Sequence, residues 1–185
     1  MRVVEGIVDV PDADRGGVYA IGNFDGVHRG HQVLLGKAID VARELGVPSG
    51  VMVFEPHPQV YFAPGAPHFR LTPKSEKLRI LQGFGLDVSV VMAFNAALAN
   101  LTAEEFIQQI LIDGLDVRHV VIGYDFHFGK KRGGTPETLV TAGEKYGFGV
   151  SVITPQSDGD MVFSSSQIRK NLAAGHVAAA AHLLG

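Results

Sequence analysis

His28 and His31 are the side chains of this sequence best placed to do chemistry. They follow an apolar run at 18–21 and a polar, glycine-containing turn at 22–26, and from Arg29 onward apolar residues recur at helical spacing. A strand, a turn and a helix in this order place both imidazoles at a helix N-terminus. Free backbone N–H groups and the helix dipole favour an anion there. The pattern therefore predicts a phosphate-binding turn.

Other interpretations of the histidine pair stay open on spacing alone. Gly30 between the histidines favours close approach of a ligand to the backbone. A His-x-x-His pair can also be half of a zinc site, although the chain has no cysteine and no glutamate beside the pair. A histidine near a helix start often caps or packs. The glycines at 22, 26 and 30 form no G-x-G-x-x-G, and no Walker lysine and hydroxyl follow.

Length and composition predict one soluble globular domain over residues 1–185, with 46% hydrophobic and 19% charged residues. A net charge of −3 gives no basic field that would favour nucleic acid or an anionic membrane. No apolar run approaches the roughly 20 residues of a membrane span. The absence of cysteine fits a reducing compartment, and we expect a cytoplasmic protein with no nucleic-acid or membrane partner.

Further apolar runs alternate with helical patterns. Strands are expected at 18–21, 49–54, 87–92, 117–123 and 148–153, and a turn at 157–160. Thr72, Thr102 and Thr135 each mark the start of an expected helix. Strand, helix and strand in alternation predict a Rossmann-like open parallel sheet of about five strands with helices on both faces, which binds ligands at its carboxyl edge.

Three more segments follow predicted strands or precede a helix. Pro56 and Pro58 stiffen the backbone around His57, and residues 124–134 are aromatic, basic and glycine-rich. Three serines at 164–166 precede a helix that carries Arg169 one turn inside, which makes a second phosphate candidate. The plain alternatives are a stiff loop, a solvated loop with its aromatics turned inward, and an ordinary serine cap with a surface arginine.

Residues 22–31, Gly-Asn-Phe-Asp-Gly-Val-His-Arg-Gly-His, resemble the HxGH motif of the nucleotidyltransferase superfamily in the form typical of bacterial FAD synthetase, the bifunctional riboflavin kinase/FMN adenylyltransferase. Four further segments resemble the same family in the same order. They are FEPHP at 54–58, RLT…EK at 70–77, G-x-D-F-x-F-G at 123–129 and ISSTxxR at 163–169, the last with Phe163 for Ile and Ser166 for Thr.

The resemblance implies transfer of AMP from ATP to the phosphate of FMN, giving FAD and pyrophosphate by in-line attack without a covalent enzyme intermediate. Mg²⁺ would bind through the ATP phosphates, with no protein ligand that can be assigned. The catalytic residues implied are His28, His31, Asn23 and Arg169. The implied ATP site adds Gly22, Phe24, Asp25, Gly30, Gly123, Ser164, Ser165 and Ser166, and the implied FMN site is Phe54, Pro56, His57, Pro58, Asp125, Phe126, Phe128 and Gly129.

Two alternatives stand beside this function. The same fold serves nucleotidyltransferases that act on other phosphorylated acceptors, and a non-catalytic flavin-nucleotide-binding or regulatory module would share the same motifs. The family usually continues into a C-terminal riboflavin kinase module, which residues 1–185 do not contain. We therefore expect no kinase activity from these residues.

Overall fold

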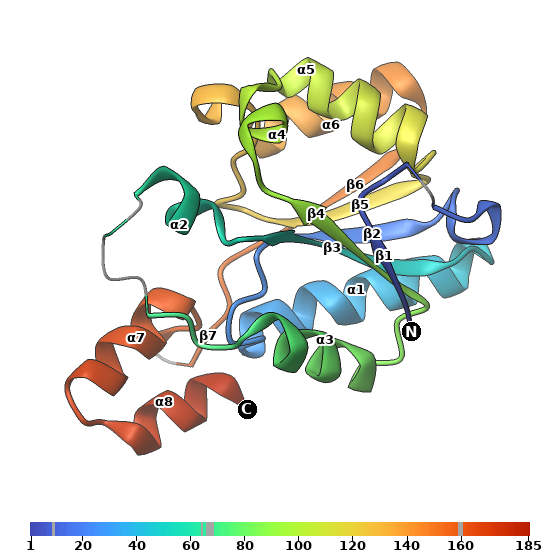
Figure 1. Cartoon of the computed structure of the whole chain (residues 1–185). Coiled ribbons are helices and arrows are strands. Elements are labelled where there is room, and N and C mark those ends of the chain that lie inside the picture. The colour runs from blue at the N-terminus through green and yellow to red at the C-terminus, as the bar shows by residue number, and fades with distance from the viewer. Residues whose placement is uncertain (9, 64, 66–68, 159–160) are drawn as a thin grey trace.

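A parallel β-sheet forms the centre of the molecule in the computed structural model, which describes residues 1–8, 10–63, 65, 69–158 and 161–185. Within these ranges the sheet has six strands in the spatial order β1-β4-β3-β2-β5-β6, and every neighbouring pair is parallel (Figure 1). The strands are β1 (Arg2–Glu5), β2 (Val18–Ile21), β3 (Ser49–Glu55), β4 (Val88–Ala93), β5 (His119–Gly123) and β6 (Gly149–Ile153).

Helices cover both faces of the sheet, as predicted (Figure 1). On one face Leu35 and Leu81, from two different helices, share a core with β2 and β3; on the other, Leu111 and Leu139 share a second core with β4 and β5. The first layer is α1 (Arg29–Leu45) and α3 (Lys74–Gly83), and the second is α5 (Ala103–Phe106), its π-helical continuation η2 (Ile107–Gly114) and α6 (Pro136–Tyr146).

Shorter elements lie mainly around the edges of the central sheet and its two helix layers. Figure 1 shows α7 and α8 side by side, beyond the end of the sheet where α1 begins. These elements are η1 (Asp12–Asp14), α2 (Pro58–Phe62), α4 (Ala96–Asn100), η3 (Lys130–Arg132), the antiparallel pair β7 (Ser157–Asp158) and β8 (Met161–Val162), α7 (Ser165–Ala173) and α8 (Val177–Leu184). Of the turn predicted at 157–160, Ser157 and Asp158 form strand β7 instead, and Gly159 and Asp160 lie outside the described residues.

The sheet has one strand more than the sequence predicted. β1 lies at the edge of the sheet and pairs only with β4. Only Val4 of its four residues is buried, whereas all four residues of β2 are buried. β1 has only Val3 and Val4 between Arg2 and Glu5, too short an apolar run to predict a strand, whereas the other five strands, β6 at the opposite edge included, were predicted.

The order of the strands creates a switch point beside β2. The chain runs outward from β2 through β3 to β4, and then returns to place β5 on the other side of β2. The helices that follow β2 and β5, α1 and α6, cover opposite faces (Figure 1). In open α/β sheets such a point leaves a crevice at the carboxyl ends of the strands, where ligands bind. None of the helices in the described ranges is both long enough and apolar enough to cross a membrane.

Candidate active site

The turn between β2 and α1, residues 22–31, is called here the histidine turn. His28 is the N-cap of α1, and its Nδ1 accepts a hydrogen bond from the backbone N–H of His31 at 3.3 Å. The two rings stack with their centroids 3.6 Å apart. The structure thus confirms the predicted strand, turn and helix, and it also confirms that His28 caps. Because Nδ1 of His28 accepts, the neutral ring carries its proton on Nε2.

Both histidines are held in the neutral form. Burial lowers the pKa of His28 to about 4, against the opposing influence of the negative Asp25. Burial also lowers the pKa of His31 well below its usual value, helped by His28 when that ring is protonated and by the positive charge of Lys77. Near neutral pH the turn therefore offers ring N–H dipoles rather than imidazolium charges.

Two buried polar atoms at the histidine turn lack a partner within the described part of the chain. These atoms are Oδ1 of Asn23 and Nδ1 of His31. A buried polar atom without a hydrogen bond is unfavourable by about 1–3 kcal/mol, and in native proteins such atoms call for an explanation. Both atoms belong to residues predicted to contact phosphate, but they differ in what they can bind: Nδ1 of His31 can donate to a phosphate oxygen in one tautomer, whereas Oδ1 of Asn23 accepts and needs a donor or a cation.

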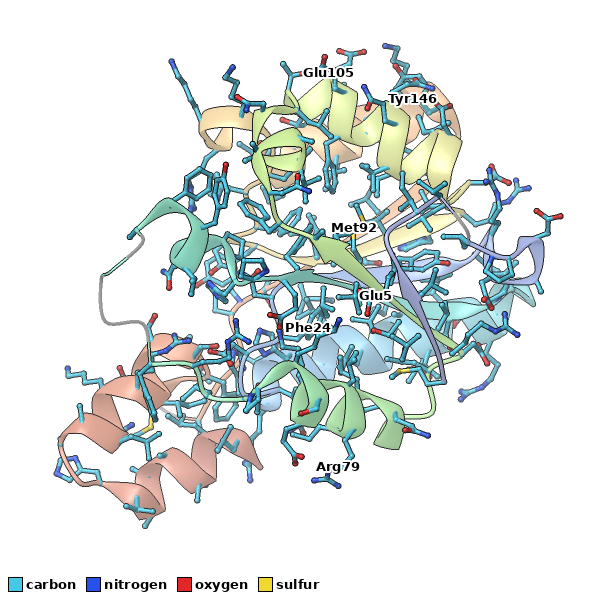
Figure 2. The ribbon with its side chains drawn as sticks, in the orientation of Figure 1. Glu5, Phe24, Arg79, Met92, Glu105 and Tyr146 are labelled. Carbon is cyan, nitrogen blue, oxygen red and sulfur yellow. The ribbon has the colours of Figure 1, made fainter. Side chains whose placement is uncertain are left out.

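Phe24 supports this turn from within. Its ring is fully buried in the core shared by β2 and α1, and its centroid lies 4.9 Å from that of His31. Figure 2 shows Phe24 in the interior near the start of α1, while Arg79 points away from the molecule. A Cβ on Gly22 would lie 3.2 Å from the Phe24 ring. Gly22 and Phe24 therefore shape the turn from the protein side.

Gly30 brings two predicted phosphate motifs together. A Cβ at this position would lie 3.1 Å from the carbonyl oxygen of Phe163 and 3.1 Å from Nδ1 of His28. Nine in ten real Cβ contacts are wider than this. The space that the sequence suggested for a ligand is therefore occupied by the backbone that leads into the serine segment, residues 164–169.

Asp25 ties the histidine turn to two distant segments. Its carboxylate is 2% exposed, accepts hydrogen bonds from the backbone N–H groups of Leu71 and Thr72, and pairs with Nη2 of Arg169. Its carbonyl oxygen accepts a hydrogen bond from Oγ of Ser165 at 2.8 Å. Burial alone would raise the pKa of Asp25, but the hydrogen bonds from Thr72 and Leu71 and the charge of Arg169 outweigh it and hold the pKa below its usual value.

Thr72 was predicted to cap the helix that follows it, and this prediction is wrong. α3 begins at Lys74 with Pro73 as its N-cap, and no side chain caps it. Instead Oγ1 of Thr72 accepts a hydrogen bond from the Gly26 N–H at 3.0 Å and lies 3.2 Å from Oδ1 of Asp25. The hydroxyl serves the histidine turn, because a tertiary contact has replaced the local one.

The serine segment is built partly as an ordinary helix start. Oγ of Ser164 accepts a hydrogen bond from the Gln167 N–H at 3.2 Å, so Ser164 is the N-cap of α7. Ser166 is exposed. Nε of Arg169 donates to the carbonyl oxygen of Phe69 at 2.6 Å, in addition to the contact with Asp25. The predicted phosphate role of Arg169 stays a prediction, because its guanidinium is held here by protein groups.

The predicted flavin side lies at the carboxyl ends of β3 and β5, which flank β2. His57 is buried and caps α2, because its Nδ1 accepts a hydrogen bond from the N–H of Gln59 at 3.1 Å. Pro56 is exposed, and Pro58 is the first residue of α2. Phe54 is buried in the core. The segment places His57 at the carboxyl edge of the sheet, where ligands of such folds bind, and the bond from Gln59 fixes its ring.

The loop after β5 turns its second phenylalanine inward. Phe128 packs in the core against Phe106, and Phe126 stacks on Phe128 with centroids 5.6 Å apart. Asp125 is exposed, and Gly129 adopts φ +71°, with Ala103 N only 2.7 Å from where its Cβ would be. The ring of Phe128 is thus a core side chain, and Phe126 and Asp125 are the more accessible members of the predicted set.

Sequence reasoning assigned Phe54 to the site but left out the aromatic side chains that cluster with it. Phe54, near the end of β3, clusters with Tyr61, Phe62 and Phe94, with centroid separations from 5.2 to 6.2 Å. Phe62 is 66% exposed. An exposed aromatic ring beside others at a ligand-binding edge offers a surface for a flat ligand. The signal in the sequence was two adjacent aromatics just after the prolines of the flavin segment.

A charge cluster of Glu55, Arg70 and Lys77 was also left out. Glu55, the last residue of β3, accepts from Nζ of Lys77 at 2.8 Å and lies 3.2 Å from Nη2 of Arg70. The Lys77 side chain is almost fully buried. No spacing rule would pair these residues, since they come from a strand, a loop and a helix.

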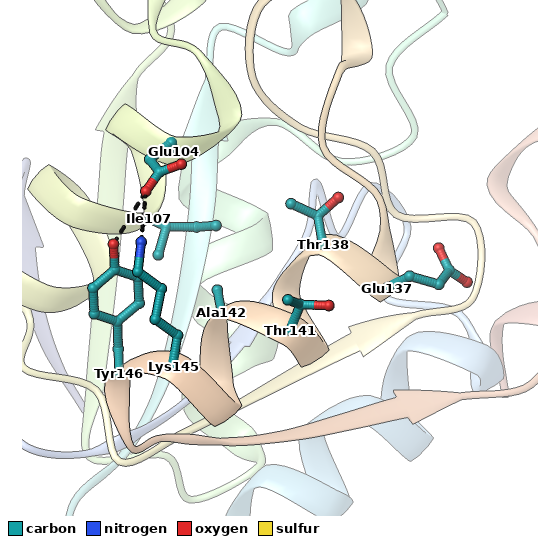
Figure 3. A pocket seen from close by; sticks show the side chains of 8 residues that line it. All are labelled: Glu104, Ile107, Glu137, Thr138, Thr141, Ala142, Lys145 and Tyr146. Carbon is teal, nitrogen blue, oxygen red and sulfur yellow. Dashed lines mark hydrogen bonds and ion pairs between the residues drawn. The ribbon is translucent and has the colours of Figure 1, made fainter.

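A separate pocket of about 470 Å³ lies in the upper helix layer between α5 and α6 (Figure 3). Glu104 accepts hydrogen bonds there from Lys145 and Tyr146, as Figure 3 shows. It contains none of the predicted site residues. Among the described residues there is no group of three or more His, Asp or Glu side chains that could hold a metal ion.

The sheet order, the helices on both faces and the histidine turn after the central strand define a Rossmann-like α/β fold of the nucleotidyltransferase type. The sequence model of FAD synthetase matches residues 10–167. The chain belongs to the FAD synthetase family.

Relatives named "Bifunctional riboflavin kinase/FMN adenylyltransferase" match this chain. The protein from Pseudomonas fluorescens is 44% identical over the whole chain, and that from Escherichia coli K12 is 39% identical, each with 59% of the relative covered. A protein from Bacillus subtilis is 38% identical over 91% of the chain and 53% of the relative. The chain therefore spans somewhat more than half of these relatives.

A solved structure described as "Crystal Structure of Macrolide-efflux Protein from Streptococcus pneumoniae" superposes on the whole chain. The TM-score is 0.85, the sequence identity is 28%, and 60% of that protein is covered. The fold is therefore shared along the full length of the chain.

Proposed function

We propose that this chain is an FMN adenylyltransferase, which transfers AMP from ATP to the phosphate of FMN and releases pyrophosphate. One observation carries the proposal. Asp25 joins the histidine turn to the serine segment through Ser165 and Arg169, so two phosphate motifs that are distant in sequence meet at the carboxyl edge of the sheet. The names of the relatives support the same reaction.

The reaction needs two anionic phosphates held in line while charge develops at the α-phosphate and on the departing pyrophosphate. His28 presents Nε2–H, since its Nδ1 is occupied by the backbone of His31. Among the described residues, Nδ1 of His31 and the acceptor Oδ1 of Asn23 are buried without a partner. The neutral imidazoles bind phosphate oxygens through their ring N–H groups, and an arriving phosphate favours protonation of the rings. No covalent intermediate on the enzyme is required.

The nucleotide and the flavin would meet at the carboxyl end of β2, between the ends of β3 and β5. The serine segment and Arg169 would bind the β- and γ-phosphates, with Gly123 nearby at the end of β5. The flavin would lie among His57, Phe126 and Asp125, with Phe62 as a further aromatic surface. FMN is favoured over another phosphorylated acceptor because aromatic side chains collect at the ends of β3 and β5.

Mg²⁺ fits this site as a companion of the substrate. Mg²⁺ in proteins is usually held by substrate phosphates, water and one or two oxygen ligands. Asn23 Oδ1 is an unpartnered oxygen at the turn, whereas the carboxylate of Asp25 is already engaged by four donors. We propose that the triphosphate brings the ion, which neutralises charge on the leaving pyrophosphate when bound.

Three wider statements belong to the same proposal. Residues 1–185 act as one nucleotidyltransferase domain, the protein works in the cytoplasm, and its partner is a riboflavin kinase module like that in the names of the relatives. The kinase partner is supported by the share of those relatives that this chain leaves uncovered.

Incubation of the chain with FMN, ATP and Mg²⁺, followed by chromatography of the flavins, tests the function. We expect FAD and pyrophosphate in equal amounts. FMN bound tightly but recovered unchanged would contradict the proposal and favour the non-catalytic flavin-binding module. Matched reactions without ATP, and with riboflavin in place of FMN, serve as controls, because riboflavin has no phosphate to attack the nucleotide.

A further inference from the structure

The charge cluster of Glu55, Arg70 and Lys77 carries more positive than negative charge. One carboxylate receives two cations, Lys77 at 2.8 Å and Arg70 at 3.2 Å. Glu55 is largely buried and Lys77 almost completely so, and these two make a compensated pair in which a buried ammonium needs its partner. Since Lys77 already balances the charge of Glu55, the positive charge of Arg70 is the one that no carboxylate of the cluster balances.

Arg70 is the accessible member. Its side chain is 31% exposed, against 12% for Glu55 and 3% for Lys77. A guanidinium has five donors in a planar fork, and among the described residues Glu55 contacts that of Arg70 at Nη2. Within this part of the chain Arg70 keeps donors that are suited to a phosphate monoester, which a guanidinium can bind through two parallel hydrogen bonds.

The backbone places Arg70 where the two substrates must meet. Its neighbour Phe69 accepts from Nε of Arg169, and its other neighbour Leu71 donates to Asp25, so both belong to the proposed ATP side. Glu55 fixes the Arg70 side chain at the end of β3, between the proposed flavin residues Phe54 and Pro56. In the proposed reaction the phosphate of FMN must reach the α-phosphate of ATP at this junction.

We propose that Arg70 binds the phosphate group of the flavin nucleotide, with Glu55 and Lys77 as the residues that position its guanidinium. This inference rests on the proposed function, and it names the group that distinguishes FMN from riboflavin at the site. Glu55 holds one side of the guanidinium, and the phosphate takes the other. Lys77 fixes Glu55 in its buried position.

The inference is tested directly by measuring the binding of FMN and of riboflavin in the absence of ATP, with quenching of flavin fluorescence as the signal. In the R70Q variant we expect FMN to bind on the order of tenfold more weakly or worse, since a charge-assisted contact is lost. Riboflavin, which has no phosphate, should bind within about twofold of its wild-type affinity. The R70K variant should recover part of the FMN affinity, because it keeps the charge but not the fork.

The matched control is K74Q. Lys74 lies four residues further on and forms an exposed ion pair with Glu5 at 2.6 Å, so this variant should leave both flavins unaffected. Equal weakening of FMN and riboflavin in both R70Q and R70K would show a purely structural role and overturn the inference. Unchanged FMN binding in R70Q would overturn it and leave the proposed function standing. Wild-type protein that binds neither flavin would overturn the proposed function itself.

Discussion

Replacing Asp25 by Asn removes one negative charge from the centre of the site while keeping the size of the side chain. Arg169 then loses its carboxylate partner, and the amide group of Asn meets backbone donors from Leu71 and Thr72. Removing one partner of a buried ion pair destabilises by about 3–5 kcal/mol. The Arg169 side chain is 21% exposed, so water screens part of the loss. We expect D25N to lower the free energy of unfolding at pH 7 by about 2–3 kcal/mol.

The difference in free energy of unfolding between wild type and D25N should depend on pH if it comes from the lost charge, and not if it comes from altered packing. The pKa of Asp25 in the folded chain lies below its ordinary value of 3.8. A carboxyl of this kind stabilises the fold at pH values above its unfolded pKa, and this contribution disappears as the pH falls through the folded pKa. The difference between wild type and D25N should therefore be full at pH 7 and shrink below about pH 4.

Urea unfolding of both proteins from pH 7 to pH 3 measures this difference. D40N is the matched control, because Asp40 forms an exposed pair with Arg43 and its loss should change stability by less than about 1 kcal/mol. A D25N protein as stable as wild type at pH 7 would refute the reasoning. So would a deficit that stays constant down to pH 3, because the effect would then not depend on charge.

Three further results are expected. H28A should lower the rate of FAD formation by on the order of 10²-fold, the usual effect of losing one charge-stabilising donor, and a near-normal rate would contradict its role. In the ligand-free chain the ring signals of His28 and His31 in an NMR titration should not move between pH 8 and pH 5.5, because burial lowers both pKa values; a midpoint near 6.5 would contradict this. G30A should destabilise by about 1–3 kcal/mol in thermal melts, because its Cβ would crowd Phe163, whereas G36A in the same helix, with nothing within 4 Å, should be neutral or stabilising. Equal melting temperatures for the two glycine variants would contradict the close approach at Gly30.

The sequence predicts those helices and strands whose pattern of apolar residues along the chain matches the residues that are buried in the fold. The run Val18–Ile21 is apolar because both faces of β2 are covered, and the helix that follows is amphipathic because it covers one of them. Thr135 and Pro136 begin α6 as predicted, since the first side chain caps and the second needs no N–H. β1 has no such pattern, because Val4 is the only one of its four residues that is buried.

The site is predicted less completely than the fold, for a physical reason. The motif residues at the histidine turn could be found from their types, but the partners of Asp25 lie 46 to 144 residues away in sequence. Thr72 has the right type for a helix cap, yet a bond to Gly26 competes with that role and prevails. Periodicity and spacing describe neighbours along the chain, and these contacts are made by neighbours in space.

The bond between Asp25 and Arg169 also sets an order of events during synthesis. A growing chain exposes the histidine turn early, but the arginine that meets it comes 144 residues later. Contacts of such wide separation form late in folding, after the more local ones. The strands β3 and β5 and the loops that follow them have by then left the ribosome. Newly made chains therefore acquire the two halves of the phosphate site only after both flavin-side loops exist.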